Sequence, residues 1–387
     1  MNLHIFGHGG SQNHGNEAIV RGIKSYFPDY TVILHSWSTN ADKKFGLGKL
    51  CIIKEQLTED KGLLFKIAKW LSKNTPIQSF YNRMRYKNFV DNIVPGDLYL
   101  LEAADQYYEG SKHIEMYIYL NKMINKKGGK TVMFGCSINS DILSDKRVVE
   151  DLNRYSLIIA REGIAYDAII NSGVKTRTIL SACPAFMVEP EKVELPSIFD
   201  KDVIGINFGF LGQGNHIYTK IMMKNYDRLV KYILKETDYN IAFIPSVNWD
   251  RKYTDITYMK RIYERHKCDR LYFFKEMSVL NNTYVYSKCK MMIALRTHTT
   301  IPALTVTTPV IMTGYKTKTT GVYRQMYEEG EDMLLSIQSL TNENELIEKF
   351  KWLEENYDSV KKDLCNKIPK YKEDSKKVRE EVLNLID

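Results

Sequence analysis

Short apolar runs of strand length alternate along this chain with longer segments whose apolar residues recur at helical spacing. In the first half the strand-like runs are Leu3 to Phe6, Thr31 to Ser36, Asp97 to Leu101, Thr131 to Phe134 and Leu157 to Ala160. Strand, helix and strand in regular succession predict a doubly wound α/β fold with a parallel sheet.

The same alternation starts again in the second half, after a segment at 184–196 that carries three prolines and is expected to be a linker. We therefore predict two Rossmann-like domains facing across a cleft, over residues 1–190 and 197–340. Bracing helices are expected over 341–387, with an interruption at Pro369.

The composition fits a two-domain protein, because 387 residues with 44% hydrophobic content exceed one compact core. Six scattered cysteines without CxxC spacing argue against a zinc site and a disulfide framework. The net charge of +8 is a mild excess that we expect to be spread along the chain, and charge alone does not choose among acidic substrates, anionic lipid and nucleic acid. Without a signal-like start or a bilayer-length apolar run, a cytoplasmic location is expected.

The segment 61–73, KGLLFKIAKWLSK, predicts an amphipathic helix. A helical wheel gathers its apolar residues on one face and its lysines on the other, and leaves Phe65 off the apolar face. This pattern is typical of a helix that rests on the inner face of a membrane rich in anionic lipid, although a surface helix packed on its own domain has a similar pattern. Peripheral membrane contact is thus one expectation.

The most informative stretch runs from Val285 to Gly321 and contains two strand-like runs, 291–295 and 309–313, separated by a segment of helical length. Cationic and aromatic side chains directly follow the two runs, namely Arg296, His298, Tyr315, Lys316 and Lys318. Ligands of open α/β sheets bind beyond the carboxyl ends of the strands. A guanidinium, an imidazole and two ammonium groups at such a place favour a small polyanion.

A second candidate is the glycine- and asparagine-rich turn from His8 to Glu17, HGGSQNHGNE, which follows the first strand and leads into a helix. Such a turn places backbone N–H groups and the positive end of a helix together, so an anion or a sugar hydroxyl could bind there. The glycines lack dinucleotide-binding spacing, and an ordinary strand-to-helix turn remains the alternative.

Several motifs together resemble the polysaccharide pyruvyl transferase family. They are NHGNEAI, AREGIAYDAIINSGV, CPAF, FIPSVNWD, LRTHTTIPALTVTTPVI and YKTKTTG. The resemblance implies a fold like that of GT-B glycosyltransferases, with phosphoenolpyruvate as the donor substrate. No cofactor or metal is expected, because no spacing of His and carboxylates suggests a metal site and the cations can neutralise the donor. The resemblance also implies that the pyruvyl group becomes a ketal on two hydroxyls of a sugar, in a surface polysaccharide or its lipid-linked precursor.

The same resemblance assigns roles to residues. Arg296 and His298 are expected to contact the donor, with His298 as an acid or base, and Lys318 is expected to neutralise the phosphate. Arg161 would close the clamp, and Glu17 would act as a base or bind a sugar hydroxyl. Further candidates are His113 as a second acid or base and Tyr315, Asn13 and Asn16 as substrate contacts. The alternative for Arg296 and His298 is a buried polar brace, and for His113 a histidine without a role.

The chain also departs from the family pattern, mostly in the first domain, where the acceptor is expected. Asn16 stands where an aspartate is usual, and Cys183 replaces an aspartate before a proline. Residues 102–105 replace a glycine-rich step. These differences concern the identity of the acceptor more than that of the donor.

Two other functions remain open from the sequence. A glycosyltransferase of the same fold would use a nucleotide sugar, but it would need a carboxylate for the ribose, and no acidic residue lies between Met291 and Tyr323. A non-enzymatic module that binds anionic glycans or nucleic acid would show a broad basic face with aromatics. No nucleic-acid partner is expected, and the oligomeric state is left open.

Overall fold

The computed structural model describes residues 1–387 except 59–61, 72–74, 103–105, 109–110, 112, 210–215, 249–253, 315–316, 328–329 and 387. The chain divides into two compact units. Unit 1 comprises residues 1–11, 19–183 and 374–387, and unit 2 comprises residues 12–18 and 184–373.

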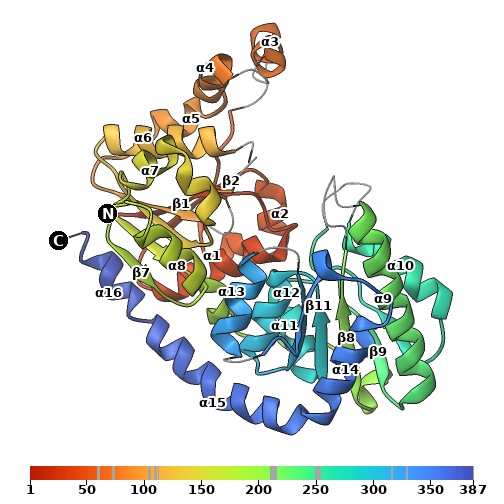
Figure 1. Ribbon diagram of the computed structural model, residues 1–387. Helices are drawn as coiled ribbons and strands as arrows, with labels where there is room; N and C mark the ends of the chain where they lie inside the picture. The colour runs from red at the N-terminus through yellow and green to blue at the C-terminus, as the bar shows by residue number, and fades with distance from the viewer. Residues whose placement is uncertain are drawn as a thin grey trace. The chain divides into compact units, whose positions relative to one another are not determined.

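Within the described residues, unit 1 is built on a seven-stranded parallel sheet in the order β3-β2-β1-β4-β5-β6-β7 (Figure 1). Its strands are β1 Leu3–His8, β2 Val32–Ser36, β3 Ile52–Glu55, β4 Leu98–Glu102, β5 Lys130–Cys136, β6 Leu157–Ala160 and β7 Thr178–Leu180. Its helices are α1 His14–Tyr26 from Ile19 onwards, α2 Thr39–Lys44, α3 Leu63–Leu71, α4 Thr75–Arg85, α5 Lys87–Asp91, α6 Ile114–Lys126, α7 Lys146–Leu152, α8 Gly163–Ile170 and, near the carboxyl terminus, α16 Val378–Leu383.

The central strands of unit 1 are apolar almost throughout, which is why they can be covered on both faces. Every residue of β1 and of β4 is buried, and Leu3 pairs with Leu98 in the ladder between them. The adjacent helix α6 buries Tyr117, Leu120 and Ile124 in the same core. One apolar stripe per helix facing an apolar sheet therefore accounts for this unit.

Unit 2 repeats the architecture, and its described strands form a six-stranded parallel sheet in the order β10-β9-β8-β11-β12-β13 (Figure 1). The strands are β8 Val203–Asn207, β9 Asn240–Phe243, β10 Leu271–Phe273, β11 Met291–Ala294, β12 Val310–Gly314 and β13 Leu334–Ser336. The helices are the start of α1 up to Ala18, α9 His216–Glu236, α10 Asp255–His266, α11 Val279–Lys288, α12 Thr297–Thr305, α13 Thr317–Met326, α14 Glu345–Glu355 and α15 Tyr357–Ser375 up to Glu373.

Both sheets have the strand order of a Rossmann fold, so the prediction of two Rossmann-like domains is confirmed. In each sheet the order reverses beside the first strand, between β1 and β4 in unit 1 and between β8 and β11 in unit 2. Such a reversal leaves a crevice at the carboxyl ends of the two strands, where ligands of this fold bind.

Two features of the units differ from what the sequence pattern indicated. The turn at 12–18 belongs to unit 2, although it follows the first strand of unit 1. The break expected at Pro369 is wrong, because Pro369 lies inside α15. Leu364 and Ile368 are both buried beside it, and a proline removes only one backbone hydrogen bond from a helix whose packing continues on either side. In the described chain, no helix combines the length and apolarity that crossing a bilayer requires.

Candidate functional site

The reversal point of the unit 2 sheet carries the cationic residues that the sequence pattern singled out. β8 ends at Asn207 and pairs with β11, which ends at Ala294. Arg296 follows two residues later and is the N-cap residue of α12, so it stands at the carboxyl edge of the sheet. His298 lies in the first turn of the same helix. Both side chains are half-buried.

Arg296 is held by a buried carboxylate. Its Nη2 and Nε donate to Oδ1 of Asp255 over 2.8 and 3.1 Å. Asp255 is fully buried, and its other oxygen accepts from the backbone N–H groups of Ser246 and Val247. A Cβ on Gly209 would lie 1.9 Å from this carboxylate, so the loop after β8 approaches closely only because it carries glycine there. The guanidinium is therefore fixed in position while 18% of the side chain stays exposed.

The N-terminal turn reaches the same place. Asn13 forms an isolated antiparallel bridge with Val247, and the backbone N–H of His14 donates to the carbonyl of Ser246. His14 Nδ1 lies 2.9 Å from Oε2 of Glu17, and this oxygen also accepts from the backbone N–H of Val279 over 3.0 Å. Glu17 thus links the start of α1 to the start of α11.

His298 packs directly on this turn. A Cβ added to Gly15 would lie 1.9 Å from Cγ of the His298 imidazole, closer than any real contact. The ring therefore fills the space that a side chain at position 15 would need. This close approach explains the glycine in the NHGNE motif better than turn geometry does.

Among the described residues, the helices α1, α10, α11 and α12 begin at this site. Their first turns are joined by the contacts of Glu17 with Val279, of Arg296 with Asp255 and of Gly15 with His298. Each helix start carries a partial positive charge that favours an anion, and the Arg296 guanidinium, paired with Asp255, stays partly exposed beside these helix starts. We refer to Asn13, Asn16, Asp255, Arg296 and His298 as the strand-end cluster.

The sequence matches the family model named polysaccharide pyruvyl transferase over residues 13–317, which span every residue of the strand-end cluster. The chain belongs to the polysaccharide pyruvyl transferase family. No curated protein is recognisably similar in sequence.

Solved structures of low sequence identity share the fold of this polysaccharide pyruvyl transferase family member. One is the UDP-GlcNAc 2-epimerase from Methanocaldococcus jannaschii, with a TM-score of 0.58, 11% identity and coverage of 91% of this chain and 92% of that one. Another is Alr3699/HepE of Anabaena in complex with UDP and glucose, with a TM-score of 0.58, 12% identity and coverage of 99% and 98%. The predicted GT-B-like fold is thus confirmed.

Five of the predicted site residues are brought together in unit 2, namely Asn13, Asn16, Glu17, Arg296 and His298. Asn13 Nδ2 donates to Oδ1 of Asn16 over 3.3 Å, and both asparagines are half-buried. Glu17 is fully buried, and its Oε2 contacts His14 and Val279, a geometry that favours a positioning role. Its prediction as a base stays a prediction.

Two other predicted residues, Tyr315 and Lys318, follow β12 in the sequence. Tyr315 is outside the described residues, and so is Lys316. Lys318 lies in the first turn of α13, and the structure does not describe its side chain. Their expected contacts with the donor therefore stay predictions.

Arg161 and His113 belong to unit 1. Arg161 follows β6, is 1% exposed and donates from Nε to Oγ of Ser137 over 2.8 Å. Within the described part of the chain its Nη2 has no hydrogen-bond partner, an arrangement that would suit an anionic ligand. His113 precedes α6, is exposed, and its ring centroid lies 5.5 Å from that of Trp37.

Unit 1 also contains a buried ionic group that the sequence reasoning missed. His8, at the end of β1, lies between Glu102, at the end of β4, and Asp42, whose Oδ1 is 2.9 Å from His8 Nε2. Asp42 also accepts from the hydroxyl of Ser11 over 2.6 Å. The sequence contains one feature that could have indicated this group: His8 and Glu102 both lie at the ends of apolar strand-like runs. The structure shows that these two strands are neighbours in the sheet.

The electrostatics of this group favour a protonated histidine. Burial alone would lower the pKa of His8, but the negative charge of Glu102 and hydrogen bonds to Asp42 and Glu102 raise it to about 10. Burial raises the pKa of Glu102, although His8 opposes that rise. At neutral pH His8 is thus an imidazolium between two carboxyl groups, which ties β1 to β4.

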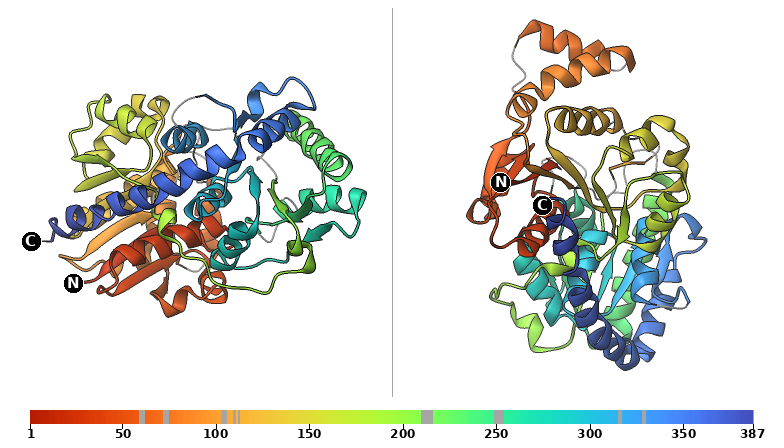
Figure 2. Two further views of the ribbon diagram at one scale, coloured as in Figure 1. Left: turned by 90° about the horizontal axis from the view of Figure 1, so that it is seen from below. Right: turned by 90° about the vertical axis from the view of Figure 1, so that its left-hand side faces the viewer.

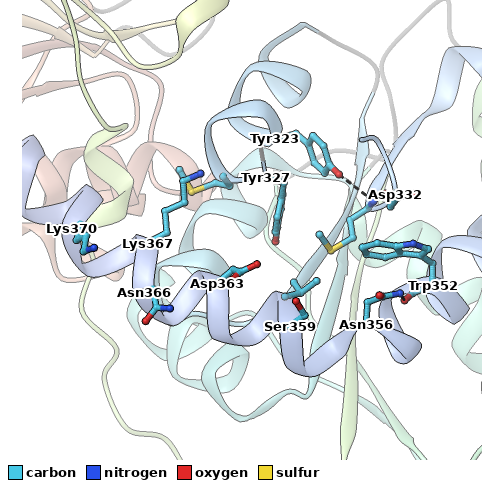
Figure 3. Close-up of a pocket in the computed structure, with 13 residues that line it drawn as sticks. Tyr323, Tyr327, Asp332, Trp352, Asn356, Ser359, Asp363, Asn366, Lys367 and Lys370 are labelled. Atoms are coloured by element: carbon cyan, nitrogen blue, oxygen red, sulfur yellow. Dashed lines mark hydrogen bonds between the residues drawn. The ribbon is translucent and has the colours of Figure 1, made fainter. Parts of the chain in front are cut away.

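A separate cavity of about 700 Å³ lies in unit 2 between α13, α14 and α15 (Figure 3). Tyr323, Trp352 and Asp363 are among its lining residues. No residue of the strand-end cluster is among its lining residues. We therefore place the candidate active site at the strand-end cluster, where fixed positive charge and strand ends coincide.

Proposed function

We propose that the protein transfers the pyruvyl group of phosphoenolpyruvate to two hydroxyls of one sugar. A proton is added to the methylene carbon, and the first hydroxyl bonds to the neighbouring carbon while losing its own proton. The bond from that carbon to the phosphate oxygen then breaks and phosphate leaves. The second hydroxyl bonds to the same carbon and closes the ketal, and its proton goes to the departing phosphate. Atoms and charges balance without an oxidant, a reductant or a metal ion.

The observation that carries this proposal is the fixed guanidinium of Arg296 at the reversal point of the sheet, with His298 two residues later in the first turn of the same helix. Phosphoenolpyruvate carries a carboxylate and a phosphate, so its binding requires cations with defined directions. Because Asp255 holds Arg296 in place, the guanidinium would not need to reorganise during the reaction.

We assign the donor carboxylate to Arg296 and the departing phosphate to Lys318. His298 would exchange the proton with the methylene carbon or with the attacking hydroxyl, since an imidazole can serve as either acid or base near neutral pH. Asn13 and Asn16 offer amide groups that suit sugar hydroxyls. Glu17 would act on the reaction by holding the turn against α11 rather than by touching substrate.

The acceptor in this proposal is a sugar of a surface polysaccharide or of its lipid-linked precursor. Arg161 is assigned to the same reaction as a second anion-binding group, because its buried Nη2 favours a negatively charged partner. His113 is exposed and is retained as a second acid or base only because of its position after a strand end.

A nucleotide-sugar glycosyltransferase is the second candidate, because Alr3699/HepE, a structure of the same fold, is described in complex with UDP and glucose. Thermal shift measurements with phosphoenolpyruvate and with a panel of nucleotide sugars separate the two. We expect phosphoenolpyruvate to raise the melting temperature of the wild type and to lose that effect in Arg296→Ala. Stabilisation by nucleotide sugars alone would contradict the proposal.

A further inference from the structure

The helices α3 and α4 form a pair that stands out from the sheet of unit 1 (Figures 1 and 2). Phe65 of α3 is 3% exposed, and its ring meets that of Tyr81 of α4 edge to face with centroids 5.6 Å apart. The Arg85 guanidinium lies 6.0 Å from the centroid of the same ring. Ala68, one turn after Phe65, is also 3% exposed. The face with Phe65 and Ala68 is thus the packed face of α3.

The other face of α3 is apolar and exposed. Leu63 is 74% exposed, Ile67 45% and Trp70 70%, and their spacing of four and three residues places them on one side of the helix. Leu63 and Trp70 are the two most exposed large hydrophobic side chains in the described part of the chain. Phe80, on α4, is 47% exposed. Burying Phe65 rather than this stripe leaves an apolar surface without a cover in unit 1.

The positive charge of the chain gathers in the same segment. Residues 61–90 contain seven Lys and Arg and no Asp or Glu, so the remaining 48 Lys and Arg nearly balance the 47 Asp and Glu of the whole chain. The net charge of +8 is therefore not spread evenly, contrary to the expectation from composition. Lys66, Arg83 and Lys87 are exposed on the two helices and the helix that follows them.

We propose that α3 and α4 dock the protein on a membrane surface that carries anionic lipid headgroups. A projecting helix with an apolar stripe can enter the boundary between headgroups and acyl chains, and Trp is suited to that boundary. Lysine side chains keep their ammonium groups among phosphates while their stems lie on apolar surface. This inference does not rest on the proposed reaction, although a lipid-linked acceptor would lie at the same surface.

The test is co-sedimentation of the full chain with vesicles of phosphatidylcholine alone and of phosphatidylcholine mixed with phosphatidylglycerol. We expect binding to the mixed vesicles that weakens as salt is added. The affinity of the double variant Leu63→Ser/Trp70→Ser for the mixed vesicles should be lower by at least roughly tenfold. Because both side chains are exposed, the variant should keep the wild-type circular dichroism spectrum and melting temperature.

The matched control is Ile170→Ser/Leu180→Ser, which removes two half-exposed apolar side chains elsewhere in unit 1 and should bind like the wild type. Tryptophan fluorescence gives an independent readout. Brominated lipids should quench the fluorescence of Trp70 in the wild type, and the part of the quenching that is due to Trp70 should be absent in Trp70→Phe. Equal sedimentation of the wild type and Leu63→Ser/Trp70→Ser, or no binding to the mixed vesicles, would overturn the proposal.

Discussion

Gly15 and His298 contact each other so closely that any side chain at position 15 would have to displace the imidazole. The strand-end pattern pointed to Arg296 and His298, because side chains that directly follow apolar strands of a parallel sheet meet at one edge. Asp255 was not predicted. It lies 41 residues before Arg296, at the start of a different helix, and no local pattern pairs the two.

The substitution Gly15→Ala tests whether the position of the His298 imidazole matters for the reaction. The added Cβ must push the imidazole away, and a displacement on the order of 1 Å at a reacting group lowers turnover about 10²-fold. Steady-state turnover with phosphoenolpyruvate should fall accordingly while the protein stays folded. The control is Gly163→Ala at the start of α8, where nothing lies within 4 Å of the added Cβ. Full activity of Gly15→Ala would show that the close contact has no role in the reaction.

At the level of elements, His8 and Glu102 join the ends of β1 and β4. Gly7, with φ +79°, accompanies a register irregularity in β1 before His8, and such a bulge turns the next side chain to a new direction. Glu102 is one of the residues that depart from the family pattern, and its carboxyl group serves this buried contact. The residue that departs from the family pattern, Glu102, thus contacts His8 within unit 1.

This contact predicts a pH dependence of stability. The pKa of His8 is about 10 in the folded protein and near 6.5 unfolded, so its contribution is complete below pH 6.5 and is lost as the pH rises towards 10. Urea unfolding of wild type and His8→Gln at pH 6, 8 and 9.5 should show a difference on the order of 2–4 kcal/mol at the lowest pH that shrinks at the highest. A difference independent of pH would contradict the buried imidazolium.

The helix at 61–73 shows what periodicity leaves undecided. The pattern predicted a helix there, and the structure has α3 at Leu63–Leu71. A helical wheel finds an apolar stripe but does not say which side meets another helix. Here Phe65, off the stripe, packs against α4, while Leu63 and Trp70 on the stripe are exposed. Tertiary packing decided the orientation, so only the structure could reveal the exposed face.

At the scale of the whole molecule, the alternation of apolar runs and helical segments predicted both sheets, because buried parallel strands are apolar along their length. It also predicted that the candidate site lies at the carboxyl ends of the strands of unit 2. The sequence pattern did not predict that the turn at 12–18 belongs to unit 2. Its partners Ser246, Val247 and Val279 lie more than two hundred residues away along the chain. The N-terminal turn thus completes the strand-end cluster of the second sheet, a long-range assembly that sequence order conceals.

The proposed reaction is tested by the release of phosphate from phosphoenolpyruvate in the presence of candidate lipid-linked sugars, with the wild type compared with His298→Ala. We expect acceptor-dependent release by the wild type and a rate lower by about 10²–10⁴-fold in His298→Ala, because a positioned acid or base contributes that much. Equal release by the two proteins would contradict the assignment of the strand-end cluster as the active site.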